Sequence, residues 1–507
     1  MLFRSPLRCA RLEISLHLVT IRLPLILPCP TMSIHIYNSL TRAKAALVPL
    51  KPGNVRMYVC GMTVYDYCHL GHARVLVVFD MVVRVLRSRG LDVEYVRNIT
   101  DIDDKIIARA AEVGEPFEAL TSRFIEAMHE DEALLNVLPP DVEPRATGYI
   151  REMIAMIETL EKKGFAYAAE NGDVYFRVHQ FPGYGTLSGR SLDSLLAGAR
   201  VEKDEAKEDP LDFVLWKAAK PAEPQWPSPW GPGRPGWHIE CSAMSRRCLG
   251  DSFDIHGGGM DLRFPHHENE IAQSEGTTGK KFVATWMHNG YVQIEQEKMS
   301  KSLGNFLTIR EIVGESADRA RTGEVIRFMI LLSHYRSPLN FSHAGLSRAR
   351  AGIERLYQVI HRCEGLARSP AEDISDDYRS RFDEALNDDF NTAAAIAVLF
   401  EIARDANRDL ERGEKSLAAF RAFQLGELAQ ILGLLYQKPE RFLGITGGIN
   451  DEGFQEAAAA VESLIEQRAQ ARRDSDFEAA DAIRGTLESR GVVLEDLPDG
   501  TTSWRQT

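Results

Sequence analysis

The sequence predicts an α/β fold, a doubly wound (Rossmann-like) parallel sheet followed by further domains, and three observations support it. From Val55 to Arg97 the chain reads strand, loop, helix, strand, and a unit of this length implies parallel strands. Ile255 and His256 end another apolar strand at three glycines, which predict a turn where backbone can approach a ligand. At 507 residues the chain is too long for one core, so roughly three or four domains are expected.

The first strand–helix–strand unit has a signal for each element. Apolar residues recur at helical spacing from about Gly71 to Ser88, and residues 92–100 (DVEYVRNIT) have the composition of a strand. Ligands of parallel sheets bind beyond the carboxyl ends of the strands, so residues 98–104 are expected at the ligand edge. The aspartates of this segment could hold a metal, but capping of the next helix by Asp101 and Asp104 is the preferred interpretation.

Composition narrows the class of protein. The chain is 44% hydrophobic and 26% charged, as in ordinary globular proteins, and its net charge is −13. The negative charge argues against a general polyanion binder. It does not exclude an enzyme that binds nucleic acid through a local basic face. Seven scattered cysteines do not resemble a disulfide framework, so we expect a reducing compartment, in which a functional cysteine serves as a metal ligand or reactive thiol.

Residues 1–31 differ from the rest of the chain. They carry four arginines and one acidic residue, with leucine-rich patches interrupted by Arg22 and by prolines. The segment contains neither a run of about 20 apolar residues nor a clean signal-peptide core. We expect an extension that is not part of the folded protein, with the working start at Met32, where a strand-like alternation begins; an arginine-rich transit peptide is the alternative.

The stretch from Met57 to Arg74 predicts a phosphate site. A short strand is followed by a loop with Cys60 and then by His69-Leu70-Gly71-His72 at the start of a helix. A helix N-terminus after a glycine-containing turn holds phosphate, and the two histidines add donors. The alternative is that His69 and His72 are ordinary helix-capping residues.

Other segments carry further chemistry. Residues 105–165 read as helical, whereas residues 171–233 are rich in turns, charge and proline and predict an insertion with a long connecting loop. A helix from about His267 places His266 and Glu270 on one side, since they are four residues apart. Lys298-Met299-Ser300-Lys301-Ser302 would form a flexible positive clamp. The chain after Arg310 predicts a helical bundle, then a charged helix and a small α/β tail.

The pair of motifs His-Leu-Gly-His and, about 225 residues later, Lys-Met-Ser-Lys-Ser resembles the signatures of class I aminoacyl-tRNA synthetases. Together with NITDIDDKII, GWHIECSAMS and DIHGGGMDLRFPHHENEIAQSE, the motifs are similar to the cysteinyl-tRNA synthetase family, from about Ser33 to the C-terminus. The resemblance implies an extension at 1–31, catalytic halves at 32–135 and 236–330, a connective insertion at 136–235, a helical bundle at 331–450 and an anticodon-binding domain at 451–507.

The resemblance implies two reactions: cysteine and ATP give cysteinyl-adenylate and pyrophosphate, and a terminal ribose hydroxyl of tRNA(Cys) then takes the cysteinyl group. Such chemistry depends on positioning and electrostatic stabilisation, with Mg²⁺ accompanying ATP. The positions that match catalytic residues are His69, His72, Lys298 and Lys301. The positions expected to bind ATP are His69, His72, Gly257, Gly258, Gly259, Asp261 and Lys301. The positions near the amino-acid pocket are Thr63, Trp237 and His256, with core packing as the alternative for Trp237.

The resemblance also implies one zinc ion, and the matching positions are Cys60, Cys241, His266 and Glu270. Two thiolates, an imidazole and a carboxylate suit zinc. His267 lacks an acidic residue four positions on, which favours His266 as the ligand, and Cys68 and Cys248 match no ligand position. A zinc ion that accepts the substrate thiolate would discriminate against serine without an editing domain.

The C-terminal segment should read the anticodon through residues that include Arg472, Arg473, Arg484, Arg490, Trp504 and Arg505. We expect a cytoplasmic monomer that does not enter membranes. One rival is a ligase that passes activated cysteine to a small amine, as in mycothiol synthesis, but such enzymes lack the anticodon module. The other is an inactive tRNA-binding regulator, which should have lost a residue of either motif or of the zinc set, and none is missing.

Overall fold

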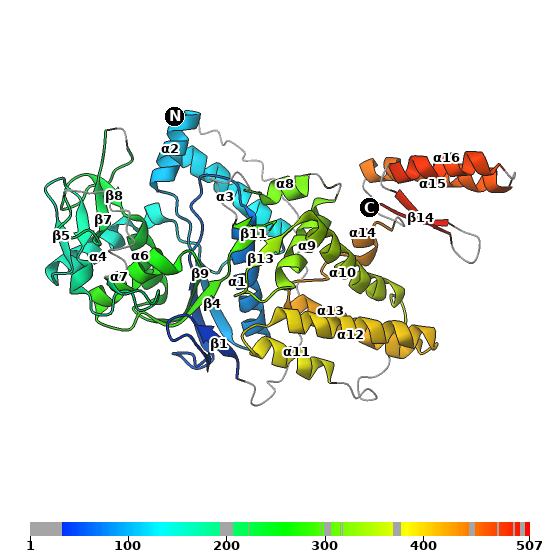
Figure 1. The fold of residues 1–507 in the computed structure, drawn as a ribbon, viewed down its shortest axis with the longest axis horizontal. Coiled ribbons are helices and arrows are strands. Elements are labelled where there is room, and N and C mark those ends of the chain that lie inside the picture. Colours follow the sequence, from blue (N-terminus) through cyan, green and yellow to red (C-terminus); the bar gives the residue numbers. More distant parts are fainter. Residues whose placement is uncertain are drawn as a thin grey trace, which may run out of the picture. The chain divides into compact units, whose positions relative to one another are not determined.

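The structure is a computed structural model. It describes residues 33–192, 206–221, 223–295, 297–298, 306–314, 316, 318–368, 377–445, 452–473, 476–489, 492–496 and 502–506 (Figure 1). The predicted N-terminal extension and the start site at Met32 lie outside the described residues. Most of the KMSKS motif, from Met299 onward, and the glycine and asparagine that follow it also lie outside them.

A four-stranded parallel sheet joins strands from residues 54–97 with strands from residues 253–289 (Figure 1). Its order is β10-β9-β3-β4, and its strands are β3 (Asn54–Val59), β4 (Asp92–Arg97), β9 (Phe253–Gly259) and β10 (Val283–Asn289). Helix α1 (Leu70–Ser88) connects β3 to β4, so the predicted strand–helix–strand unit is confirmed, with the helix one residue longer at its start. Met57 pairs with both Tyr95 and Ile255, which aligns the carboxyl ends of three strands at one edge.

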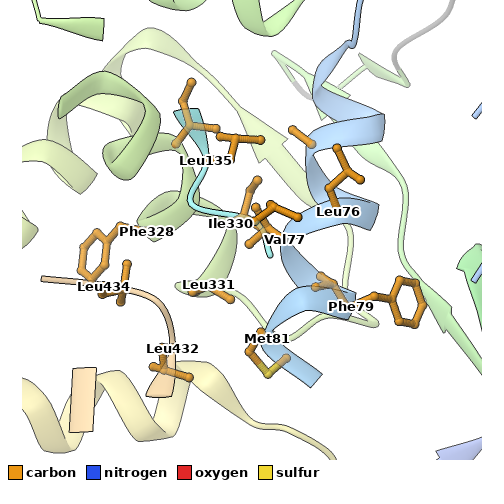
Figure 2. Packing of buried hydrophobic residues seen from close by; sticks show 14 of the residues in the cluster. Leu76, Val77, Phe79, Met81, Leu135, Phe328, Ile330, Leu331, Leu432 and Leu434 are labelled. Atoms are coloured by element: carbon orange, nitrogen blue, oxygen red, sulfur yellow. The ribbon is translucent and has the colours of Figure 1, made fainter. Parts of the chain in front are cut away.

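Helix α1 is buried on nearly every side because its apolar residues extend around most of its circumference. In Figure 2, Val77 points toward Ile330 of α9 (Arg319–Leu331), whereas Phe79 points to another side of the helix. A Cβ atom added at Gly257 of β9 would lie 2.3 Å from the Phe79 ring, so glycine allows this close packing. All three glycines, 257 to 259, lie within β9; the predicted turn at this position was wrong.

The insertion between the sheet halves contains more structure than the sequence indicated. Helices α2 (Asp104–Val113), α3 (Phe117–Leu134) and α4 (Ile150–Lys162) confirm most of the helical prediction for 105–165. The predicted long loop was wrong, because an antiparallel sheet follows, made of β5 (Ala166–Ala168), β6 (Val174–Phe176), β7 (Phe213–Ala218) and β8 (Gly233–Pro235). Strands this short show little alternation in sequence, and burial of Trp216 supplies much of their core.

The aspartates after β4 have structural roles that differ from the prediction. Asp103 is the N-cap of α2 and accepts a hydrogen bond from the Lys105 amide at 2.9 Å, so capping by Asp101 and Asp104 was wrong. Asp101 instead accepts from the backbone N–H and hydroxyl of Thr147, at 2.9 and 2.6 Å. Within the described residues, none of the three aspartates belongs to a group of side chains that could hold a metal.

Further elements surround the sheet. Helix α6 (Trp237–Leu249) precedes β9, and a π-helical turn (Arg263–His267) leads into α7 (Glu268–Thr278). A hairpin near the start of the described chain, β1 (His35–Asn38) with β2 (Ala43–Ala46), confirms the predicted strand after Met32. A small sheet joins β12 (Glu297–Lys298), β11 (Val292–Ile294) and β13 (Leu339–Phe341), and α8 (Ile309–Gly314) follows the KMSKS segment.

The C-terminal third is mostly helical. Its helices are α10 (His343–Arg362), α11 (Tyr378–Asn387), α12 (Thr392–Glu411), α13 (Lys415–Ile431), α14 (Pro439–Leu443), α15 (Glu452–Arg473) and α16 (Phe477–Ser489). Strands β14 (Val492–Asp496) and β15 (Thr502–Gln506) pair antiparallel, and they follow α16 in the small α/β tail that the sequence predicted. Among the helices that the structure describes, none combines the length and apolar character needed to cross a membrane.

Candidate metal centre and nucleotide site

Four buried side chains converge beyond the carboxyl end of β3. They are the predicted metal ligands: Cys60 after β3, Cys241 in α6, His266 in the π-helical turn and Glu270 in the first turn of α7. One donor atom from each lies within 4.8 Å of the other three. The Cys60 Sγ is 3.5 Å from the Cys241 Sγ, 3.5 Å from His266 Nε2 and 3.4 Å from Glu270 Oε1. The structure therefore brings all four predicted residues together.

The donor set fits a tetrahedral zinc ion. With bonds of about 2.0–2.3 Å, a tetrahedral site has ligand–ligand distances of about 3.3–3.8 Å. The distances from Cys60 lie within or close to this range, and His266 Nε2 lies 3.1 Å from Glu270 Oε1. Two sulfur donors, one imidazole and one carboxylate match the ligand preferences of zinc.

Burial and neighbouring charges shift the pKa of all four side chains, and burial raises the pKa of the Cys60 thiol well above its usual value. Burial raises the pKa of the Cys241 thiol, but hydrogen bonds with Cys60 and His266 outweigh burial and lower it to about 6. Burial lowers the pKa of His266, but Glu270 and Cys241 outweigh it and raise it to about 10. Burial also opposes ionisation of Glu270, yet His256 and His266 hold the pKa of that carboxyl well below its usual value. Negative charge on Cys241 and Glu270 is thus stabilised by positive charge beside it, which a bound metal ion would supply in place of the His266 proton.

Two further histidines, buried His256 and half-buried His238, each orient one of the four side chains. His256 Nε2 lies 2.9 Å from Glu270 Oε2, the oxygen that does not contact Cys60. His238 Nδ1 lies 3.0 Å from His266 Nδ1, which leaves His266 Nε2 directed at the other donors. Burial lowers the pKa of His238 well below its usual value, so this ring is neutral. Such outer partners fix ligand orientation in metal sites.

The sequence did not identify His238, although a residue three positions before Cys241 on a helix faces the same side. Trp237 is 38% exposed and its ring contacts the His266 ring with centroids 4.4 Å apart and planes tilted by 33°, so it covers the cluster and does not belong to the core. His267 lies behind the cluster, 3.9 Å from Glu270 Oε1 and hydrogen-bonded to His288 at 2.8 Å. Together with Cys60, His256 and Glu270 it forms a second, overlapping group of donors.

The first signature motif caps helix α1. His69 is the N-cap, and its Nδ1 accepts from the amides of Gly71 and His72 at 3.0 and 3.3 Å. His72 Nδ1 accepts from the His69 amide at 3.3 Å, and the two rings stack with centroids 3.6 Å apart. The cap uses Nδ1 of each ring, so a role of the other ring nitrogen toward phosphate is compatible with capping.

The chain that follows the KMSKS motif is bound to the first motif. The Leu70 amide donates to the Leu307 carbonyl at 3.1 Å, and the Ile309 amide donates to the Cys68 carbonyl at 2.9 Å. The Phe306 ring meets His69 edge-on at 4.4 Å. Lys301 lies outside the described residues, and Lys298 is described only as the end of β12. The carboxyl-terminal anchor of the KMSKS loop thus lies at the helix end that would hold phosphate.

Comparisons with known proteins identify the family. Residues 46–351 match the description "tRNA synthetases class I (C) catalytic domain", residues 381–437 match "DALR domain", and residues 455–505 match "Cysteinyl-tRNA ligase anticodon binding domain". The chain is 58% identical over 476 residues to the cysteine--tRNA ligase of Alkalilimnicola ehrlichii and 60% identical over 474 residues to that of Thioalkalivibrio sulfidiphilus. Each alignment covers 93% of this chain and 100% of the relative. The chain belongs to the cysteine--tRNA ligase family.

The resemblance seen in the motifs is therefore confirmed, as is the fold class. Methionyl-tRNA synthetase of Mycobacterium tuberculosis, solved with methionyl-adenylate, has the same fold at a TM-score of 0.54 and 15% identity, covering 78% of this chain and 94% of that chain. The match to an anticodon-binding domain of the cysteine--tRNA ligase family does not favour the small-amine ligase.

The other positions predicted to bind ATP or cysteine are held mainly by contacts within the protein. A Cβ at Gly258 would approach His267 at 2.8 Å, and one at Gly259 would approach the Asp261 carboxylate at 2.4 Å, so packing within the protein already requires these glycines. Thr63 forms an isolated parallel bridge with Thr100. Their roles toward ATP and cysteine, like that of fully buried His256, stay predictions.

Residues expected to contact tRNA are only partly described. Arg472 in α15 and Arg484 in α16 are exposed. Arg490 lies outside the described residues, as do the side chains of Arg473, Trp504 and Arg505. Cys68 and Cys248 lie outside the metal cluster, where Cys68 Sγ contacts Met62 at 3.3 Å and Cys248 Sγ contacts Tyr149 at 3.6 Å.

Proposed function

We propose that this chain activates L-cysteine with ATP, giving cysteinyl-adenylate and diphosphate, and then transfers the cysteinyl group to the 3′-terminal adenosine of tRNA(Cys). The observation that carries the proposal is the buried set of Cys60, Cys241, His266 and Glu270 at the sheet edge. That set lies in a chain of the cysteine--tRNA ligase family whose residues 455–505 match the anticodon-binding domain of that family.

The four side chains would hold one zinc ion, which when bound supplies a coordination position for a soft sulfur donor. Serine offers a hydroxyl in place of that thiolate and would lose the interaction, so the site would separate the two amino acids at the binding step. The exposed Trp237 ring, in contact with the His266 ring, would close over the amino acid. Buried His256 and half-buried His238 would keep the carboxylate and the imidazole in their orientations.

In the first reaction a carboxylate oxygen of cysteine attacks the α-phosphorus of ATP, and the bond from that phosphorus to the bridging oxygen of diphosphate breaks. Negative charge builds on the phosphate oxygens. His69 and His72, held at the N-terminus of α1, would donate to these oxygens, and Lys301 with Lys298 would stabilise the leaving diphosphate. Mg²⁺ would accompany ATP.

In the second reaction the ribose 2′-hydroxyl of the terminal adenosine attacks the carbonyl carbon of the adenylate. The bond to the phosphate oxygen breaks, and AMP leaves with the electron pair. Catalysis then depends on orientation of the tRNA end against the bound adenylate. We propose that the C-terminal helices and strands orient the tRNA through its anticodon, with Arg472 and Arg484 among the exposed basic residues.

We also propose that the enzyme acts as a monomer in the cytoplasm. The five described cysteines, Cys60, Cys68, Cys241, Cys248 and Cys363, are all free thiols, as expected in a reducing compartment. Light scattering of the purified protein would test the monomer, and a mass near twice 56.8 kDa would contradict it.

The function is tested by ATP–pyrophosphate exchange with cysteine and with serine, followed by aminoacylation of tRNA(Cys). We expect exchange that depends on cysteine, little with serine, and charging of tRNA(Cys). Exchange without charging of tRNA would favour the small-amine ligase. Absence of exchange with cysteine would refute the proposal.

A further inference from the structure

One buried side chain, Asn98, contacts the segments that carry both cysteine ligands of the proposed metal site. It follows β4 and is 1% exposed. Its Oδ1 accepts a hydrogen bond from the Gly61 amide at 2.9 Å, next to Cys60, and lies 3.6 Å from the Cys241 Sγ. These two cysteines are 181 positions apart in sequence, and Asn98 comes from neither segment.

The contact continues through a second route to Cys241. Asn98 Nδ2 lies 3.4 Å from the Thr100 Oγ1, and the Thr100 hydroxyl donates to Glu240 Oε2 at 3.1 Å. Glu240 directly precedes Cys241 in α6, and both Thr100 and Glu240 are at most 2% exposed. The network therefore begins beside Cys60 and ends beside Cys241, with donor and acceptor roles consistent throughout.

The backbone at the Cys60 end has almost no freedom. A Cβ atom at Gly61 would lie 1.6 Å from the Asn98 carbonyl oxygen, so the two chains touch there. The Cys60 amide also donates to the Gly257 carbonyl at 3.1 Å. These backbone contacts hold Cys60 and Gly61 against the residues that follow β4 and against β9. The side-chain network then connects this backbone to α6.

We propose that Asn98, Thr100 and Glu240 are positioning residues that hold the Cys60 and Cys241 sulfur atoms at metal-binding separation. The inference rests on the proposed function, since it assumes that these sulfurs bind the metal. His266 and Glu270 have outer partners in His238 and His256; the network supplies the corresponding support for the thiolates. In the structure the two sulfur atoms share a hydrogen bond at 3.5 Å. Once both are deprotonated to bind a metal they would repel one another, so contacts with the protein must then hold their spacing.

The test is zinc affinity, measured on metal-stripped full-length protein by competition with a chromophoric chelator. Asn98→Ala and Thr100→Val should weaken zinc binding by about 10- to 100-fold, the range typical of outer-partner changes. Thr100→Ser retains the hydroxyl and should bind zinc within about twofold of wild type. Thr100→Val is nearly isosteric, so it remains informative if Asn98→Ala does not fold.

Asn54→Ala is the matched control. Asn54 also links β3 to β4, through Asp92 at 2.8 Å, but at the opposite end of the strands, so its loss should not change zinc affinity. A steady-state measurement adds a second readout: the KM for cysteine should rise in Asn98→Ala and Thr100→Val while the KM for ATP stays unchanged.

Unchanged zinc affinity in folded Asn98→Ala and Thr100→Val would overturn the positioning role and leave the proposed function intact. Equal weakening in Thr100→Ser or Asn54→Ala would also overturn it, because the effect would then be general destabilisation. If the wild-type protein itself binds no zinc, the metal part of the proposed function fails, and the inference fails with it.

Discussion

His69 and His72 cap helix α1 reciprocally: the Nδ1 of each ring accepts a hydrogen bond from the backbone amide of the other residue, at 3.3 Å in both directions. The motif therefore has a structural role, the start of a buried helix, as well as its expected role toward phosphate. The two roles use different ring nitrogens, so suitable substitutions can separate them.

We predict that His69→Asn separates the two roles. Asparagine is a strong N-cap residue, so the free energy of unfolding should change by no more than about 0.5 kcal/mol. The side chain lacks the second ring nitrogen, so the rate of ATP–pyrophosphate exchange should fall by about 100-fold or more. Urea denaturation and exchange kinetics measure the two effects.

His69→Ala is the comparison for this prediction. It removes the cap as well as the ring and should lose about 1 kcal/mol of stability in addition to activity. Exchange at the wild-type rate in His69→Asn would show that the histidine acts only as a cap.

We predict that Cys241→Ser loses the metal and selectivity for cysteine. A hydroxyl is a poor zinc ligand, and the substrate thiolate would lose its binding partner. Zinc content should fall to background and the KM for cysteine should rise by about 100-fold or more. The matched control is Cys248→Ser on the same helix, since Cys248 is half-buried and contacts Tyr149 outside the cluster. Normal cysteine affinity in Cys241→Ser would refute the ligand assignment.

The sequence predicted the elements with long periodic signals and missed those that depend on tertiary contacts. Helix α1 has helical apolar spacing over 19 residues and was placed to within one residue. The strands of the insertion are three to six residues long and become strands only through pairing, so no local pattern revealed them. Gly257 was predicted to form a turn, but glycine is needed there because the Phe79 ring packs against it. Phe79 lies 178 positions away in the chain, so the local sequence could not reveal this contact.

The same distinction applies to the candidate site. His266 and Glu270 are four residues apart and could be paired by spacing, whereas Cys60 and Cys241 were assigned only through resemblance to a family. The side chains that support the ligands, such as His238 and Asn98, carry no motif of their own. Their roles arise from contacts between segments that the fold brings together.

We predict that Arg74→Met strongly destabilises the catalytic region. Arg74 of α1 is fully buried and donates to the carbonyls of Tyr291 at 2.8 Å and Tyr335 at 3.0 Å, and also to those of Ser337 and His334. Removal of the guanidinium takes one donor from each of these carbonyls, although those of Tyr291, Tyr335 and His334 keep a backbone amide donor. The loss of several charged hydrogen bonds at a buried position should cost about 3 kcal/mol or more in the free energy of unfolding. Urea denaturation measures the change.

Arg87→Met on the same helix is the control. Arg87 forms a partly exposed ion pair with Asp141 at 2.8 Å, so its loss should cost about 1 kcal/mol or less. Arg74→Lys should recover only part of the stability, because a single ammonium group cannot reach all of the carbonyls. Equal effects of Arg74→Met and Arg87→Met would contradict this account.

We predict that Gly257→Ala and the Phe79 ring are energetically coupled. The added methyl group would lie 2.3 Å from the ring, and overpacking of this kind costs about 1–3 kcal/mol. Phe79→Leu should restore part of the loss, so the double variant would be more stable than the sum of the single changes. Gly314→Ala, with no atom within 4 Å of the new methyl group, is the neutral control. Additive effects at Gly257 and Phe79 would refute the coupling.

We predict that Glu324 makes the stability of the helical region depend on pH. This carboxyl group of α9 is fully buried and accepts hydrogen bonds from Tyr357 at 2.8 Å, Gln437 at 2.9 Å and the Leu435 amide at 2.7 Å. Burial raises its pKa to about 7, although these hydrogen bonds act in the opposite direction. A carboxyl group whose pKa is higher in the folded state binds its proton more tightly there, so folding favours the protonated form.

The stabilisation from protonated Glu324 should be complete below the unfolded pKa of about 4.5 and should disappear as the pH rises through 7. The difference between these pKa values corresponds to about 3 kcal/mol. Glu324→Gln keeps a neutral group of similar size, so it removes the titration. Urea denaturation at pH 5, 6, 7 and 8 should show wild-type stability falling relative to this variant as the pH rises. A difference that is constant across these pH values, or that grows in favour of the wild type, would refute the assignment, because Glu324 would then be ionised in the folded protein throughout.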